Sequence, residues 1–213
     1  ETVAYLSIKA REMLDEAGYS DMQIMASNSL DEYLVRDLIS QGAQIDSFGV
    51  GERLITSKSE PVFGGVYKLV AVENEQHEII PKIKVSENVE KITTPHFKKA
   101  YRFFDKLTGK ALGDVLTLHD EVINTDQPYM LFHPIHTWKK KIVTDYVVKP
   151  LQVQLFDKGT RVYDCPPIEE VRQYCSDQID TLWEQIRRFE NPQTYYVDYS
   201  EKLWRVKNDL LET

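Results

Sequence analysis

The sequence predicts a mixed α/β protein, with a partial α/β segment at residues 1–62, a β-rich region at residues 63–150 and a helical region at residues 151–213. Helical and strand-like patterns alternate twice near the N-terminus, which is typical of α/β units with a parallel sheet. Short strand-like runs separated by polar turns follow, and two stretches with helical periodicity come last.

The first α/β unit is expected in the first 26 residues. Apolar residues recur at helical spacing over residues 3–17, and Gly18 stands where a left-handed C-terminal cap is expected. The apolar run at residues 22–26 then predicts a strand.

The second unit repeats this order. Ser29 and Glu32 have the Ser-x-x-Glu form of a capping box, so a helix is expected over residues 30–39, before Gly42. The apolar run at residues 43–50 predicts a second strand. Two strands cannot form a parallel sheet that buries both faces. We therefore expect further strands to come from a larger α/β domain or from another chain.

The later regions change from strands to helices. We expect Lys139–Lys141 to interrupt the β-rich region, residues 142–148 to form a strand, and Pro166-Pro167 to open a helix that ends before Asn191. Other expected strands lie at residues 66–72, 78–85, 101–104 and 115–118, with a turn at 108–110. A last helix follows Asp198, with Leu203, Val206, Leu210 and Leu211 facing inward.

Composition restricts the partners and the compartment. The formal net charge of −8 argues against a nucleic-acid-binding surface. No apolar run approaches the roughly 20 residues of a membrane span, so no membrane is expected as a partner. Glu1-Thr2 begins no signal peptide, and two cysteines fit a reducing, cytoplasmic setting. Because the chain opens in a helical pattern without Met, we expect a piece of a longer protein.

Small residues follow both strands of the N-terminal segment and predict a phosphate site. Ser27 and Asn28 follow the first strand, and Gly49, Gly51 and Arg53 follow the second. Ligands of parallel α/β sheets bind at the carboxyl ends of strands, where helix starts favour anions. The alternative is a well-capped helix without a ligand.

No catalytic or metal-binding residue is expected in this chain. His133 and His136 form a His-x-x-His pair, but Pro134 opposes a helix that would place both rings on one face. We therefore interpret the pair as structural. Cys165 lacks a predicted histidine partner for nucleophilic chemistry.

The chain resembles the bacterial nicotinate phosphoribosyltransferases in ordered blocks along nearly its whole length. These blocks are Ala4–Ser7, Ala26–Asn28, Leu30–Glu32, Ile45–Gly51, Arg53-Leu54, Gly64–Val70, Ser86–Asn88, Glu90–Thr93, Tyr101-Arg102, Gly113-Asp114, Phe132–Pro134, His136-Thr137 and Pro192–Val197. The resemblance implies the C-terminal portion of a type II phosphoribosyltransferase, with part of an irregular α/β barrel. It also implies that Ser27, Asn28, Gly49 and Gly51 cradle a phosphate.

The implied reaction joins nicotinate to phosphoribosyl pyrophosphate in NAD biosynthesis, with ATP hydrolysis and Mg²⁺, in a full-length homodimer. Glu1-Thr2-Val3 replaces the acidic run usual in the family, Glu52 stands where Thr is usual, and no histidine matches the phosphorylated one. We therefore expect this chain alone to be inactive and to bind neither Mg²⁺ nor ATP tightly. A noncatalytic phosphate-binding or structural module is the alternative, and a relative specific for nicotinamide or quinolinate is a third.

Overall fold

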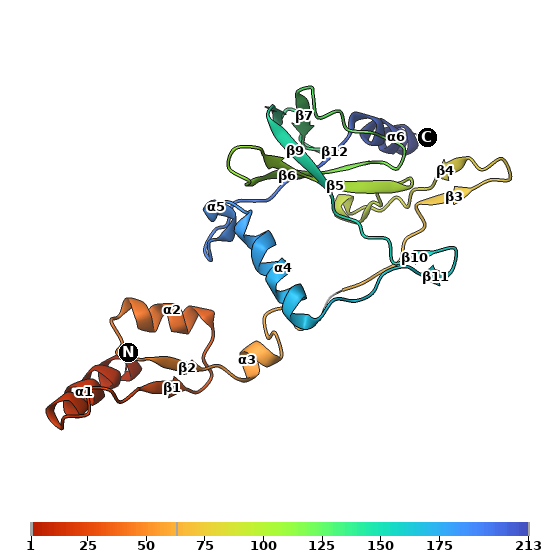
Figure 1. Cartoon of the computed structure of the whole chain (residues 1–213). Coiled ribbons are helices and arrows are strands. Elements are labelled where there is room, and N and C mark those ends of the chain that lie inside the picture. The colour runs from red at the N-terminus through yellow and green to blue at the C-terminus, as the bar shows by residue number, and fades with distance from the viewer. Residues whose placement is uncertain (1, 63, 213) are drawn as a thin grey trace. The chain divides into compact units, whose positions relative to one another are not determined.

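A computed structural model describes residues 2–62 and 64–212. The chain is mixed α/β and divides into two compact units, Glu1–Val66 and Tyr67–Thr213 (Figure 1). None of the helices in the described residues is both long and apolar enough to span a membrane.

The N-terminal unit contains the parallel α/β arrangement that the sequence predicts. Its elements are α1 (Thr2–Glu16), β1 (Met25–Ser27), α2 (Glu32–Ser40), β2 (Ser47–Gly49) and α3 (Glu52–Ile55). β1 and β2 pair in parallel, with Ser27 opposite Gly49, so both strands end at the same sheet edge. The small core beside them consists of Ala4, Leu30 and Leu38, with Val35, Ala43, Ile45, Phe48 and Val50 packed against it.

The helix ends of this unit confirm one predicted cap and correct another. Gly18 has a φ of +82°, as expected of a left-handed cap after α1. The predicted capping box of Ser29 and Glu32 is wrong, because Ser29 lies in the left-handed region at φ +50°. Asp31 is the N-cap instead, and its Oδ1 accepts a hydrogen bond from the Leu34 N–H at 2.9 Å. Helix α2 therefore begins at Glu32, two residues later than predicted.

The C-terminal unit is built on a four-stranded sheet in the order β12-β6-β5-β9. These strands are β5 (Lys98–Asp105), β6 (Ala111–Leu118), β9 (Tyr146–Pro150) and β12 (Val197–Tyr199). β5 pairs antiparallel with both β6 and β9, whereas β12 lies parallel to β6. The core beneath the sheet contains Phe103, Val115, Leu131, Val143 and Tyr146.

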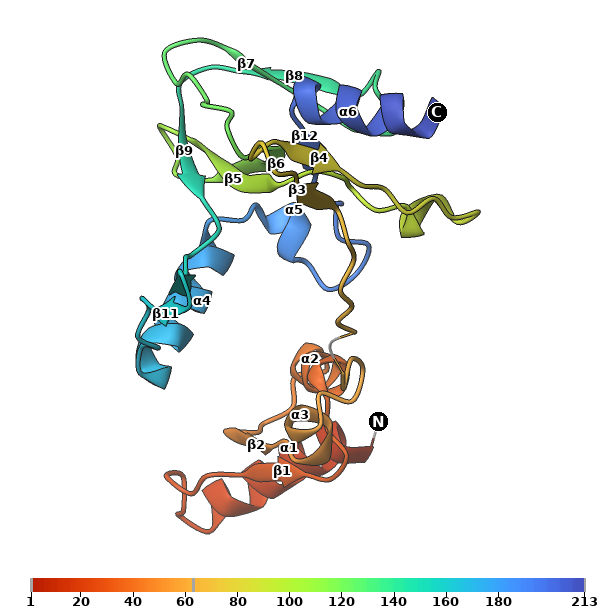
Figure 2. The ribbon, with the colours of Figure 1, turned by 90° about the vertical axis from the view of Figure 1, so that its right-hand side faces the viewer.

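Three hairpins and three helices complete this unit, with a short 3₁₀ helix at Val89–Lys91. The hairpins are β3 (Ala71–Glu73) with β4 (Ile79–Pro81), β7 (Tyr129–Phe132) with β8 (Lys140–Val143), and β10 (Phe156–Asp157) with β11 (Thr160–Arg161). The helices are α4 (Ile168–Asp180), α5 (Glu184–Arg187) and α6 (Glu201–Glu212). Helix α6 lies beside the β7–β8 hairpin (Figure 2), where the Trp204 and Phe132 rings meet edge to face at 6.4 Å.

Four sequence predictions for this unit are wrong in detail. Lys140 and Lys141 belong to strand β8 rather than to an interruption. The strand expected at residues 142–148 is two strands, β8 and β9, because Asp145 turns the chain at φ +50°. The long helix after Pro166-Pro167 ends at Asp180 and resumes as α5. The region at 151–213, expected to be helical, also contributes β12 to the central sheet and the hairpin β10–β11.

A buried polar network connects the strands of the central sheet to the segment before β12. The Arg102 guanidinium donates two hydrogen bonds to the Asp114 carboxylate, at 2.8 and 3.0 Å. The Tyr195 hydroxyl donates a hydrogen bond to Asp114 Oδ1 at 2.7 Å. Arg102 and Asp114 form an ion pair in which both side chains are mostly buried. Burial and the hydrogen bond to Asp114 raise the pKa of Tyr195, so its hydroxyl remains a donor.

Candidate functional site

The residues predicted to bind phosphate meet at the carboxyl ends of β1 and β2. A cavity of about 270 Å³ lies there, lined by Asn28, Ser29, Leu30, Gly49, Gly51, Glu52, Arg53 and Lys58. Asn28, Gly49, Gly51 and Arg53 thus line one cavity, as parallel pairing of the strands requires. Ser27 lies one residue before the lining, at the end of β1 and opposite Gly49.

Gly49 is needed because the two strand ends pack closely. A Cβ atom at this position would lie 3.0 Å from the Ser27 Cβ and 3.0 Å from the Met25 Cε. Gly51 is different, since a Cβ there would meet nothing within 4 Å and its φ is −107°. The second glycine therefore leaves the cavity mouth open rather than allowing a left-handed turn.

Two ion pairs set the charge around the cavity. Arg53 Nη1 lies 3.0 Å from Asp31 Oδ2, and the Asp31 side chain is mostly buried. Because Asp31 also caps α2, this pair holds the guanidinium against the start of that helix. Lys58 Nζ lies 3.2 Å from Glu52 Oε1, with both side chains exposed. Each cation at the cavity is therefore paired with a carboxylate.

The Lys58 pair changes the expectation for Glu52. A carboxylate at this position, where Thr is usual in the family, would repel a phosphate, but the Lys58 ammonium offsets that charge. Sequence reasoning missed both Asp31 and Lys58. The helix predicted over residues 30–39 places Asp31 inside the helix rather than at its N-cap. Lys58 lies beyond α3, in a turn that no periodicity marks.

The His133 ring makes local hydrogen bonds within its own turn. His133 Nδ1 accepts hydrogen bonds from the N–H groups of Ile135 and His136, at 3.1 and 3.0 Å. Partial burial, His136 and Lys139 lower the pKa of His133, which favours the neutral ring. Within residues 2–62 and 64–212, no three His, Cys, Asp or Glu side chains come together as a metal site.

Comparisons with known proteins identify the same relatives from sequence and from structure. Residues 97–207 match the family model described as the nicotinate phosphoribosyltransferase C-terminal domain. The nicotinate phosphoribosyltransferase of Bacillus subtilis (strain 168) is 44% identical over 96% of this chain and 42% of its own length. That of Caenorhabditis elegans is 33% identical over 98% of this chain and 38% of its own length.

A solved structure has the same fold. The crystal structure of human nicotinic acid phosphoribosyltransferase superposes on this chain with a TM-score of 0.73, at 23% sequence identity. The match covers 99% of this chain and 39% of the human chain. The chain therefore spans about two fifths of the length of the relatives that it matches.

Proposed function

The chain belongs to the nicotinate phosphoribosyltransferase C-terminal domain family, and from this membership we propose that it is the C-terminal portion of a nicotinate phosphoribosyltransferase. The complete enzyme would join nicotinate to phosphoribosyl pyrophosphate, giving nicotinate mononucleotide and pyrophosphate, with ATP hydrolysis, in NAD biosynthesis. We place this enzyme in the cytoplasm, as a homodimer. The 44% identity to the Bacillus subtilis protein over almost the whole chain is the observation that carries this proposal.

Within that enzyme, the N-terminal unit is proposed to contribute two strands of an irregular α/β barrel. Its sheet has only β1 and β2 among the described residues. Large apolar side chains remain exposed beside them, including Met13, Met22, Met25 and Leu54. Further barrel strands and helices would cover this apolar surface, because a parallel sheet is normally buried on both faces.

The cavity at the strand ends is proposed to hold the phosphate group of the ribose substrate. Asn28, Gly49 and Gly51 allow a close approach of the backbone, and Arg53 and Lys58 supply positive charge. Held at this point, the ribose would be oriented while positive charge develops at its anomeric carbon. Since both cations are already paired, we expect affinity in this chain alone on the order of millimolar, about 4 kcal/mol.

Magnesium and ATP are implied by the family, and we assign no ligand for either to this chain. The described residues bring together no cluster of three or more His, Cys, Asp or Glu side chains. The groups that handle Mg²⁺ and ATP are therefore proposed to lie in the rest of the enzyme. On the same ground we propose that this chain is inactive by itself.

An activity assay tests the main proposal. The 213-residue chain, incubated with nicotinate, phosphoribosyl pyrophosphate, ATP and Mg²⁺, should form no nicotinate mononucleotide above a control without protein. The protein that joins this chain to the missing barrel should form it. Turnover by the isolated chain, abolished by a substitution within it, would contradict this division of labour.

The phosphate site has its own test, an amide NMR titration of the chain with ribose 5-phosphate. Shifts are expected at residues 28–30 and 49–53, and Lys58→Gln should weaken them about threefold or more. Lys9→Gln is the matched control, because Lys9 is also an exposed lysine paired with a glutamate in the same unit. Unchanged signals at these strand ends would contradict a phosphate site here. That result would not alter the outcome expected in the activity assay.

The alternative is a noncatalytic module that keeps the phosphate site alone. It is favoured by the cavity itself, whose lining comes entirely from residues 28–58 of the N-terminal unit. The two proposals can be distinguished by measuring both binding and activity in a protein that joins this chain to the missing barrel. A joined protein that binds ribose 5-phosphate but forms no nicotinate mononucleotide would support the module.

A further inference from the structure

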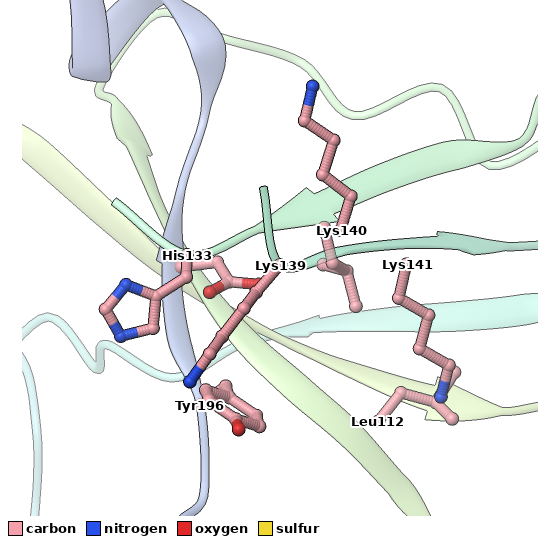
Figure 3. A pocket seen from close by; sticks show the side chains of 8 residues that line it. Leu112, His133, Lys139, Lys140, Lys141 and Tyr196 are labelled. Carbon is pink, nitrogen blue, oxygen red and sulfur yellow. The ribbon is translucent and has the colours of Figure 1, made fainter. Parts of the chain in front are cut away.

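We infer that the C-terminal unit holds a second anion site, between β8 and β12, for a compact phosphate monoester that also carries a hydroxyl group. The cavity has a volume of about 230 Å³, and all of its lining residues belong to the C-terminal unit. Its lining residues are Leu112, Leu131, His133, Lys139, Lys140, Lys141, Tyr196 and Asp198 (Figure 3).

The first observation is a buried carboxylate without a partner. Asp198 lies in β12, and the residue is only 6% exposed. Its Oδ1 accepts no hydrogen bond from any described residue. Burial raises the pKa of Asp198 to about 6, so a carboxylate forms here at neutral pH at a cost in free energy. A donor that enters the cavity would satisfy this acceptor.

The second observation is positive charge in the lining of the same cavity. Lys139 and Lys141 extend past the cavity toward Tyr196 and Leu112, respectively, while Lys140 points away (Figure 3). Within the described part of the chain, the ammonium groups of Lys139 and Lys141 form neither an ion pair nor a hydrogen bond. Burial first, and then the charges of His136 and Lys139, lower the pKa of His133, which lines the same cavity.

Together these groups define the chemistry of the ligand. Its anionic group would accept hydrogen bonds from the two ammonium groups, as phosphate does. Its hydroxyl would donate to Asp198, which an anion without a protonated oxygen, such as sulfate, cannot do. The volume of about 230 Å³ is below the range of roughly 300–1,000 Å³ for drug-sized ligands, so a phosphorylated polyol or sugar fits better than a nucleotide.

Three probes distinguish the components of this ligand. Amide NMR titrations of the 213-residue chain would use glycerol 3-phosphate, ribose 5-phosphate and sulfate, each at neutral pH. We expect shifts at residues 139–141 and 196–198 with both esters, and binding at least tenfold weaker with sulfate, which has no hydroxyl to donate. The ester that binds more tightly shows whether the site prefers the phosphate ester of an open-chain polyol or that of a sugar ring. Equal binding of all three probes would overturn the role of Asp198.

Matched variants test the residues. Asp198→Asn should weaken ester binding about tenfold and should not weaken sulfate binding, whereas Asp120→Asn in an exposed turn should alter neither. Lys139→Gln with Lys141→Gln should weaken all three probes, and Lys202→Gln on the exposed face of α6 should not. The fluorescence spectrum of each variant checks that it is folded. No shift at residues 139–141 in the unaltered chain, or ester binding unaffected by these substitutions, would overturn the inference.

Discussion

Asp198→Asn is expected to stabilise the C-terminal unit at neutral pH, although it removes a charged residue. The carboxyl is buried in β12, and its Oδ1 has no hydrogen-bond partner among the described residues. Ionising it in the folded protein therefore costs more than ionising it in the unfolded chain. Asparagine keeps the shape of the side chain and carries no charge, so this cost disappears.

The magnitude follows from the pKa. Burial raises the pKa of Asp198 from 3.8 to about 6, which corresponds to about 3 kcal/mol at neutral pH. The new amide is itself buried without a partner, which offsets about 1 kcal/mol. The free energy of unfolding should therefore rise by about 2 kcal/mol in the variant.

The pH dependence has a definite sign. Because the folded-state pKa is the higher one, the protonated carboxyl's contribution to stability is fully present below pH 3.8 and is lost as pH rises through about 6. The advantage of the variant should consequently shrink as the pH is lowered from neutral to below about 4. Comparing the two proteins at each pH cancels the titration of all other groups.

Urea unfolding followed by tryptophan fluorescence is the assay. All three tryptophans, Trp138, Trp183 and Trp204, lie in the unit Tyr67–Thr213, so the signal reports this unit alone. A variant that is less stable at neutral pH, or a difference that does not change with pH, would refute the reasoning. Asp120→Asn, in an exposed turn, is the control that should change little.

Three further outcomes are expected. Asp114→Ala should destabilise the C-terminal unit by about 3–5 kcal/mol in the same urea assay, because the mostly buried Arg102 is left without its carboxylate. A loss of stability below about 1 kcal/mol would contradict this. Gly49→Val should disrupt the pairing of β1 with β2, seen as faster amide exchange at residues 47–49, because its Cβ would lie 3.0 Å from the Ser27 Cβ; Gly65→Ala, with open space around it, should not. Amides at residues 43–50 should exchange faster than those of β5 and β6, since β2 has one neighbouring strand whereas β5 and β6 lie inside a four-stranded sheet. Equal protection of these amides in a proven monomer would contradict this expectation.

Much of the local structure could be predicted from the sequence, because it depends on neighbours in the chain. Helical periodicity located α1 and α6. The buried Leu203 faces inward as expected, whereas Leu211, also expected to face inward, is 39% exposed near the end of α6. Gly109 at φ +69° forms the predicted turn between β5 and β6. The order helix, strand, helix, strand also brought Asn28 and Gly49 to one cavity, because parallel strands end at a common edge.

What the sequence could not predict depends on contacts between distant segments. Strand β12 has three residues and no strong pattern of its own, and it forms because the edge of β6 accepts it in parallel. That pairing buries Asp198, which the sequence presented only as a residue before a helix. The pairing of β7 with β8 likewise places Lys139–Lys141 in the lining of the same cavity as that carboxylate. Local periodicity determined which segments form helices and strands, whereas strand pairing alone decided which charged groups are buried and which of them face one another.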